Sequence, residues 1–281
     1  MSSAIHSDVR SVDPGRRLRS MPRARRAAGV GVLVASLCTL TACATTESRL
    51  AAEQQSRRAR SHFNLGVDHL ENGRMARGLR ELLTAERYAP KDPNIQYGLG
   101  RAYLGKGKTD ESEAHLLRAI EIFPDHHDAR LTLSGLYVLL ERYDDSAEHS
   151  QVLLDDPTFP APWLAHTNLG WIHLKQGDRI QARREFEFSL EYNERHWQSV
   201  LNLGILEGED GKHVEALRAY EKVLQLTNSP SAIAEVNYRI AQVYVTMGKR
   251  KRAVQHLMVA VANSPDSQWG LKSEEYLKLL R

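Results

Sequence analysis

The chain is poor in the residue types from which small, self-contained sites are built. Its 281 residues include two cysteines, too few for a disulfide framework or a thiolate zinc site. Only 7% of the residues are aromatic. The apolar run 27–42 has 16 residues, whereas a helix that spans a membrane needs about 20. The composition is that of a globular protein, and its function has to be sought in the pattern of the sequence.

The formal net charge of the chain is +3, but the residues after position 42 carry no excess of positive charge. Residues 1–42 hold seven arginines against two aspartates, so the rest of the chain has 31 basic and 33 acidic side chains. Nucleic-acid binding needs a stripe of positive charge to face the phosphates, and this near-neutral body offers none. Nucleic acid is therefore excluded as a partner.

The first 42 residues predict a signal peptide, because basic residues precede a short apolar core that ends in small residues. The sequence Leu40-Thr41-Ala42-Cys43 resembles the bacterial lipobox, which implies that Cys43 is lipidated and becomes the first mature residue. Residues 43–58 then form a lipidated tether, and the true start is expected at Met21. The alternatives are a signal without lipid, or a short membrane anchor with a chance cysteine.

The body repeats with a period close to 34 residues. A small residue after an apolar one recurs in steps of 34, 34, 36, 34 and 37, and further small residues follow twelve positions after each. The recurring positions are Gly66, Gly100, Ser134, Gly170, Gly204 and Ala241. Small residues at fixed offsets let paired helices approach closely, and prolines end the units.

This pattern resembles the tetratricopeptide repeat and implies an all-α solenoid of six helix-turn-helix repeats, each too small to bury its apolar face alone. The six expected repeats are 59–92, 93–126, 127–158, 163–196, 197–230 and 234–267. Residues 268–281 are expected to form a C-terminal capping helix that shields the last repeat.

Signals of catalysis are missing from the sequence, and we expect a non-enzyme without metal or cofactor. The stretch 100–107 imitates a phosphate-binding loop but lacks the Ser or Thr that would hold Mg²⁺. His126, His127 and Asp128 have no second ligand cluster at a metal-binding spacing. The pairs His62/His69 and His166/His173 are better explained by packing, because other repeats place Tyr at the second position of each pair.

The tetratricopeptide resemblance also implies which positions line the concave groove. Most of these positions are apolar here, which suits an amphipathic helix or an apolar strip of a partner. Each of these side chains could equally pack against the neighbouring helix. The candidates are Phe63, Val67, Leu70, Tyr97, Leu104, Leu131, Val138, Leu139 and Trp171. The first eight cluster in the first three repeats, where we expect the partner to bind.

A lipobox followed by six such repeats and a capping helix resembles the type IV pilus biogenesis lipoproteins, or secretin pilotins. Their middle-repeat motif is matched here only at Asn168 and Gly170. The resemblance implies a lipid-anchored protein on the periplasmic side of the outer membrane, which binds secretin subunits and promotes their assembly. The rivals are a general adaptor that scaffolds peptidoglycan or envelope enzymes, and a recruiting arm of a polysaccharide or glycosyltransferase system.

Overall fold

The computed structural model describes residues 28–280 of the chain, with side chains from residue 47 onward. The chain divides into two compact units, 1–54 and 55–281. The described residues form helices joined by short turns, without a strand. The helices are α1 (Ala28–Glu71), α2 (Met75–Tyr88), α3 (Pro93–Leu104), α4 (Thr109–Ile122), α5 (His127–Leu139), α6 (Tyr143–Asp155), α7 (Pro162–Lys175), α8 (Arg179–Tyr192), α9 (Trp197–Glu209), α10 (His213–Leu226), α11 (Pro230–Thr246), α12 (Arg250–Asn263) and α13 (Gln268–Leu279).

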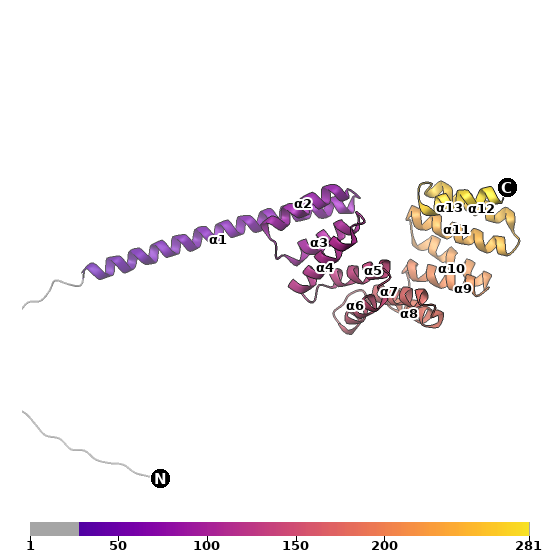
Figure 1. The fold of residues 1–281 in the computed structure, drawn as a ribbon, viewed down its shortest axis with the longest axis horizontal. Coiled ribbons are helices and arrows are strands. Elements are labelled where there is room, and N and C mark those ends of the chain that lie inside the picture. The colour runs from indigo at the N-terminus through magenta and orange to yellow at the C-terminus, as the bar shows by residue number, and fades with distance from the viewer. Residues whose placement is uncertain (1–27, 281) are drawn as a thin grey trace, which may run out of the picture. The chain divides into compact units, whose positions relative to one another are not determined.

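In the second unit the helices pair as consecutive hairpins that follow one another in chain order (Figure 1). The end of α1 pairs with α2, and α3 with α4, and this continues to α11 with α12. The last helix, α13, packs on both α11 and α12. The first helix of each hairpin is called helix A below, and the second helix B. This arrangement confirms the predicted all-α solenoid of tetratricopeptide repeats.

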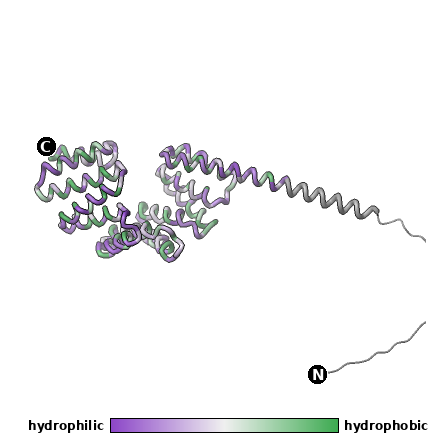
Figure 2. The backbone as a smooth tube through the Cα atoms, turned by 180° about the vertical axis from the view of Figure 1, so that it is seen from behind, coloured by the Kyte–Doolittle hydropathy of each residue, from purple (hydrophilic) through white to green (hydrophobic). Residues whose placement is uncertain are grey.

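Hydrophobic and hydrophilic residues alternate along the helices of the second unit (Figure 2). Each hairpin closes around small residues at the crossing of its two helices. Leu82, Leu116 and Phe186 are fully buried in helices B and lie against the glycines of the helices A before them. A Cβ atom added at Gly170 would lie 2.5 Å from the ring of Phe186. No larger residue fits there without moving the ring, which explains the small residue of the repeat pattern.

The turn between helices A and B contains a residue with positive φ in each of the six repeats, and in five of them this residue is glycine. Glycine occupies it at Gly73, Gly107, Gly177, Gly211 and Gly248, with φ between 69° and 84°. In the third repeat Glu141 takes the same conformation, at φ 58°. A residue with a Cβ atom is strained there by about 1–2 kcal/mol, so this turn is less favourable than the other five.

A polar pair that includes a histidine joins helices A and B in five of the six hairpins. Its members are always 19 residues apart, with distances of 2.7–3.3 Å. The pairs are His62–Glu81, Gln96–His115, Arg130–His149, His166–Glu185 and Asn237–His256. Each histidine ring also lies on an aromatic ring of its own hairpin. Burial lowers the pKa of His115, His149 and His256, so these rings are held in the neutral form.

Much of the predicted signal peptide lies outside the described residues, which exclude 1–27, and the side chain of Cys43 is not among those described. The backbone of the predicted tether 43–58 belongs to the continuous helix α1. Within the part of the chain that the structure describes, no helix combines the length and the apolar character needed to cross a membrane. Helix α11 begins at Pro230, earlier than the start of the sixth repeat expected at residue 234.

Candidate functional site: a groove along the helices A

A cavity of about 380 Å³ lies between the helices A of the first three repeats. Phe63 and Val67 of α1 and Tyr97 of α3 form its apolar floor. Gly98 belongs to the same wall, and a Cβ atom there would lie 3.5 Å from the Phe63 ring and 2.9 Å from the buried Leu82. The glycine thus keeps α3 close to the first hairpin, so that the two rings share one surface.

The prediction that Leu70 lines the groove is wrong, because its side chain is buried in the core of the first hairpin. Only 6% of the residue is exposed, and its Cδ2 atom lies 2.6 Å from the place of a Cβ atom on Gly78 of α2. The same helix presents Val67 to the cavity and Leu70 to its own hairpin. The helix-packing register that separates the two cannot be read from the repeat period alone.

Some of the other predicted groove residues pack against buried clusters, and others are exposed to solvent. Leu104 and Trp171 are partly buried and pack against buried clusters of their own hairpins, and Leu131 packs against the Leu153 cluster. Val138 is half-buried, and Leu139 is 65% exposed at the end of α5. The structure therefore gathers Phe63, Val67 and Tyr97 around one cavity, whereas the remaining candidates do not join that cavity.

Carboxylates dominate the charged groups of this cavity. Asp68, Glu71 and Asp128 line it together with a single cation, Arg101. Arg101 lies over the Tyr97 ring, 5.6 Å from its centre. Burial raises the pKa of the Tyr97 hydroxyl, and the nearby Arg101 only partly offsets this effect, so the phenol stays neutral. Asn64 and Asn94 complete the polar part of the lining.

A second cavity shares lining residues with the first, and a third cavity shares lining residues with the second. The second, of about 280 Å³, shares Asn94 and Asp128 with the first and also contains Phe123, His126 and Pro160. The third, of about 490 Å³, shares Asp125 and His127 with the second and extends to Asp155 and Asp156. The three cavities form one tract along the first three repeats and the turn before α7, which we call the N-terminal groove.

His126 is the buried polar group of this groove, with 8% of its surface exposed. It caps α5, where its Nδ1 atom accepts the backbone N–H of Ala129 at 3.3 Å. Its ring lies between Tyr97 and Phe123, with centroids 5.1 and 6.2 Å away. Burial lowers the pKa of the ring, so the neutral form carries its proton on Nε2. Among the described residues, no atom accepts a hydrogen bond from that Nε2.

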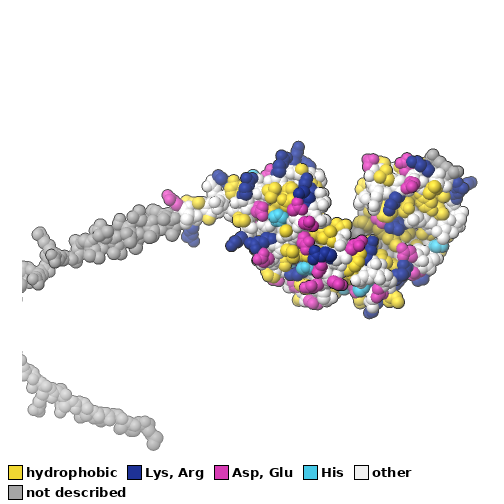
Figure 3. All heavy atoms as spheres, in the orientation of Figure 1, with side chains coloured by type: hydrophobic (Ala, Val, Ile, Leu, Met, Phe, Trp, Pro, Cys, Tyr) yellow, Lys and Arg dark blue, Asp and Glu magenta, His cyan; other side chains and the backbone are white. Residues whose placement is uncertain are grey.

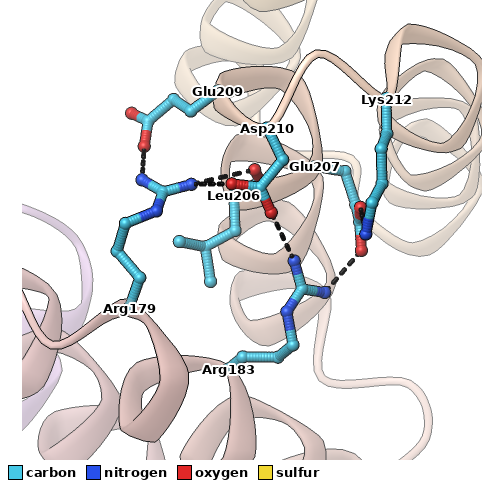
Figure 4. Close-up of polar contacts among 7 residues, drawn as sticks. All are labelled: Arg179, Arg183, Leu206, Glu207, Glu209, Asp210 and Lys212. Atoms are coloured by element: carbon cyan, nitrogen blue, oxygen red, sulfur yellow. Dashed lines mark hydrogen bonds and ion pairs between the residues drawn. The ribbon is translucent and has the colours of Figure 1, made fainter.

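Ion pairs link neighbouring repeats outside the groove. At the junction of the fourth and fifth repeats, Arg183 of α8 contacts Glu207 and Asp210, and Lys212 contacts Glu207 at 3.1 Å (Figure 4). Arg179 adds contacts to Glu209 and Asp210. These groups join the start of one helix B to the next hairpin, so they belong to the scaffold.

The fifth repeat begins with a buried hydroxyl cluster. His196 directly precedes α9, and its Nδ1 atom lies 3.0–3.4 Å from the hydroxyls of Thr167, Ser189 and Ser199. Burial lowers the pKa of His196 to about 4. Across the described part of the chain, no group of three His, Cys, Asp or Glu residues is arranged to hold a metal ion.

The face shown in the space-filling view carries both signs of charge, interspersed with small apolar patches (Figure 3). The acidic character of the N-terminal groove is therefore a local property of its lining residues. It is not part of a field of one sign over the visible face.

Comparisons with known proteins match the repeat over most of the chain. Family models described as tetratricopeptide repeat match residues 63–127, 97–161, 167–233 and 234–267. The mouse Superkiller complex protein 3 is 29% identical over 112 residues, which cover 40% of this chain but only 7% of that protein. Type IV pilus assembly protein PilF of Pseudomonas aeruginosa is 23% identical over 188 residues, which cover 55% of this chain and 74% of PilF.

Two solved structures of pilus proteins share the fold. The structure of Pseudomonas aeruginosa PilF has a TM-score of 0.62 at 16% identity and covers 79% of this chain and 99% of its own. The structure of PilW, described as a widely conserved type IV pilus biogenesis factor, has a TM-score of 0.63 at 18% identity, with coverage of 76% and 97%. At these identities the likeness establishes the arrangement of the helices.

Proposed function

The chain belongs to the tetratricopeptide repeat family, and we propose that it is a secretin pilotin of a type IV pilus machine. In this proposal the protein is an outer-membrane lipoprotein that faces the periplasm. It binds secretin subunits through the N-terminal groove and promotes their targeting and multimerisation. It acts by binding and catalyses no reaction.

The similarity to PilF carries the proposal, because it extends over 74% of that pilus assembly protein. The lipobox around Cys43 supports a lipid anchor, since a multiply acylated cysteine holds a protein firmly to a membrane. The apolar floor of the groove supports the binding role, because an extended apolar surface suits one face of a partner helix.

Deletion of the gene tests the proposal, with an immunoblot for heat-resistant secretin multimers as the readout. We expect the multimers to disappear and to return when the wild-type gene is restored. A Cys43→Ser gene should give protein that takes up no labelled palmitate and fractionates away from membranes, and it should restore few multimers. Normal multimers after deletion would contradict the pilotin assignment and favour the general envelope adaptor.

A further inference from the structure

The N-terminal groove combines an apolar floor with an acidic rim, and the rim continues through all three of its cavities. The carboxylates that line the cavities are Asp68, Glu71, Asp125, Asp128, Asp155 and Asp156. The cations among the lining residues are Arg101 and Arg130. Arg101 lies on Tyr97, and Arg130 donates to the backbone oxygen of Pro124 at 3.0 Å, so the protein itself already engages both.

Among the described residues, four of the six rim carboxylates form no ion pair. Asp68 pairs with Arg74 at 3.2 Å and Asp156 with His127 at 2.7 Å, whereas Asp155 accepts a hydrogen bond only from the neutral amide of Gln151. By contrast, no basic side chain within the described residues forms an ion pair with Glu71, Asp125 or Asp128. These three are exposed to solvent, where a bound cationic group can reach them.

We propose that the N-terminal groove binds a polypeptide segment with an apolar face bordered by Lys or Arg side chains. The apolar face covers Phe63, Val67 and Tyr97, and the basic side chains pair with Glu71, Asp125 and Asp128. The inference rests on the proposed function and deepens it, because it specifies the chemistry of the secretin segment that the groove selects.

Two synthetic amphipathic helical peptides with the same leucine face, one with lysine and one with glutamate on the polar face, test the charge preference. Their binding to the purified full chain in detergent is followed by fluorescence anisotropy. At low salt we expect the lysine peptide to bind at least tenfold more tightly, because each exposed ion pair changes affinity by about 1.4- to 5-fold. Salt at about 0.5 M should narrow the difference, because these pairs are exposed.

The variant Glu71→Lys/Asp125→Lys should remove the preference, since it reverses two unpaired rim charges without touching the apolar floor. The matched control is Glu187→Lys/Glu194→Lys, which reverses two exposed charges on and after α8 and should retain the preference. Thermal melts check that both variants are folded. The inference would be overturned if the wild-type chain bound the two peptides equally. It would also be overturned if the groove variant kept the preference for the lysine peptide and the control variant lost it.

Capture of the secretin subunit by the same preparations separates this inference from the proposed function. If the wild-type chain captures secretin but shows no peptide preference, the basic-segment inference is wrong and the pilotin assignment stands. If the lysine peptide is preferred and secretin is not captured, the groove chemistry is right and the partner is another protein.

Discussion

The division of α1 into a groove side and a core side can be tested by placing the same residue on each side. Val67 lies in the groove floor, and Leu70, one turn further along, lies in the first hairpin core. We therefore compare Val67→Lys with Leu70→Lys. The two variants have the same new charge on the same helix, so the difference between them reports only where each side chain points.

The expected cost of Leu70→Lys follows from its burial. Replacing a buried leucine by alanine lowers the free energy of unfolding by about 2–5 kcal/mol, and burial of an unpaired ammonium group adds to this. Domains of ordinary stability unfold with about 5–15 kcal/mol. The first repeat has a neighbouring repeat on one side only, so we expect it to unfold before the rest.

The expected cost of Val67→Lys is small, because the residue is partly open to solvent and changes at such sites are usually within about 0.5 kcal/mol. Its effect should fall on binding. A valine fully buried at the contact contributes about 1.5 kcal/mol or more, and a cation there also opposes a basic partner segment. Capture of the secretin subunit should therefore weaken by at least about tenfold.

Urea denaturation followed by circular dichroism gives the stability of each variant, and capture by the full chain in detergent gives the binding. The reasoning would be refuted if both variants lost stability equally, because Val67 would then belong to the core. It would also be refuted if a folded Val67→Lys protein captured secretin as well as the wild type. In that case the partner uses another surface.

Two further predictions concern the scaffold. Glu141→Gly should raise the free energy of unfolding by about 1 kcal/mol in urea denaturation, because glycine relieves the positive φ at the third turn, whereas Gly177→Glu should lower it by a similar amount. Burial holds the pKa of His196 at about 4, below the ordinary 6.5, so its neutral form stabilises the fold fully above pH 6.5 and this stability is lost as the pH falls from 6.5 toward 4. His196→Gln should reduce the slope of stability against pH in that window, by up to about 1.4 kcal/mol per pH unit, and an unchanged slope would show that His196 does not titrate there.

The sequence was sufficient to predict the fold because the repeat is enforced by packing that depends on residue size. The glycines at the crossing of helices A and B have no room for a side chain, as Gly170 against Phe186 shows, so their spacing reports the hairpins directly. The histidine pairs were predicted only in part. Packing was expected for His62 and His166, but their partners Glu81 and Glu185, 19 residues further along the chain, were not identified.

The groove was harder to predict, because it depends on rotation within one turn of a helix. Val67 and Leu70 are both apolar members of the predicted set, yet one faces the cavity and the other the core. The acidic rim was missed because its members come from separate parts of the chain: the end of α1, the turn before α5, the start of α5 and the end of α6. Only the stacking of the repeats brings Glu71, Asp125 and Asp128 along one tract.

Two repeat junctions contain ion pairs, and the residues that form them differ between the two. At the junction of the second and third repeats, Glu113 accepts from Tyr137 and Arg142 at 2.9 and 2.8 Å. The positions 70 residues later are the Arg183, Glu207 and Lys212 of the other ionic junction.

Glu113 and its counterpart Arg183 have opposite charges, whereas Arg142 and its counterpart Lys212 are both basic, and Tyr137 corresponds to Glu207. At the later junction Glu207 therefore supplies the carboxylate that pairs with both Arg183 and Lys212. At the earlier junction Glu113 supplies the carboxylate that pairs with Arg142. The short turns of the chain already fix the order of the repeats, so these pairs bear on how one hairpin is held against the next, and partly exposed pairs contribute about 0–1 kcal/mol each.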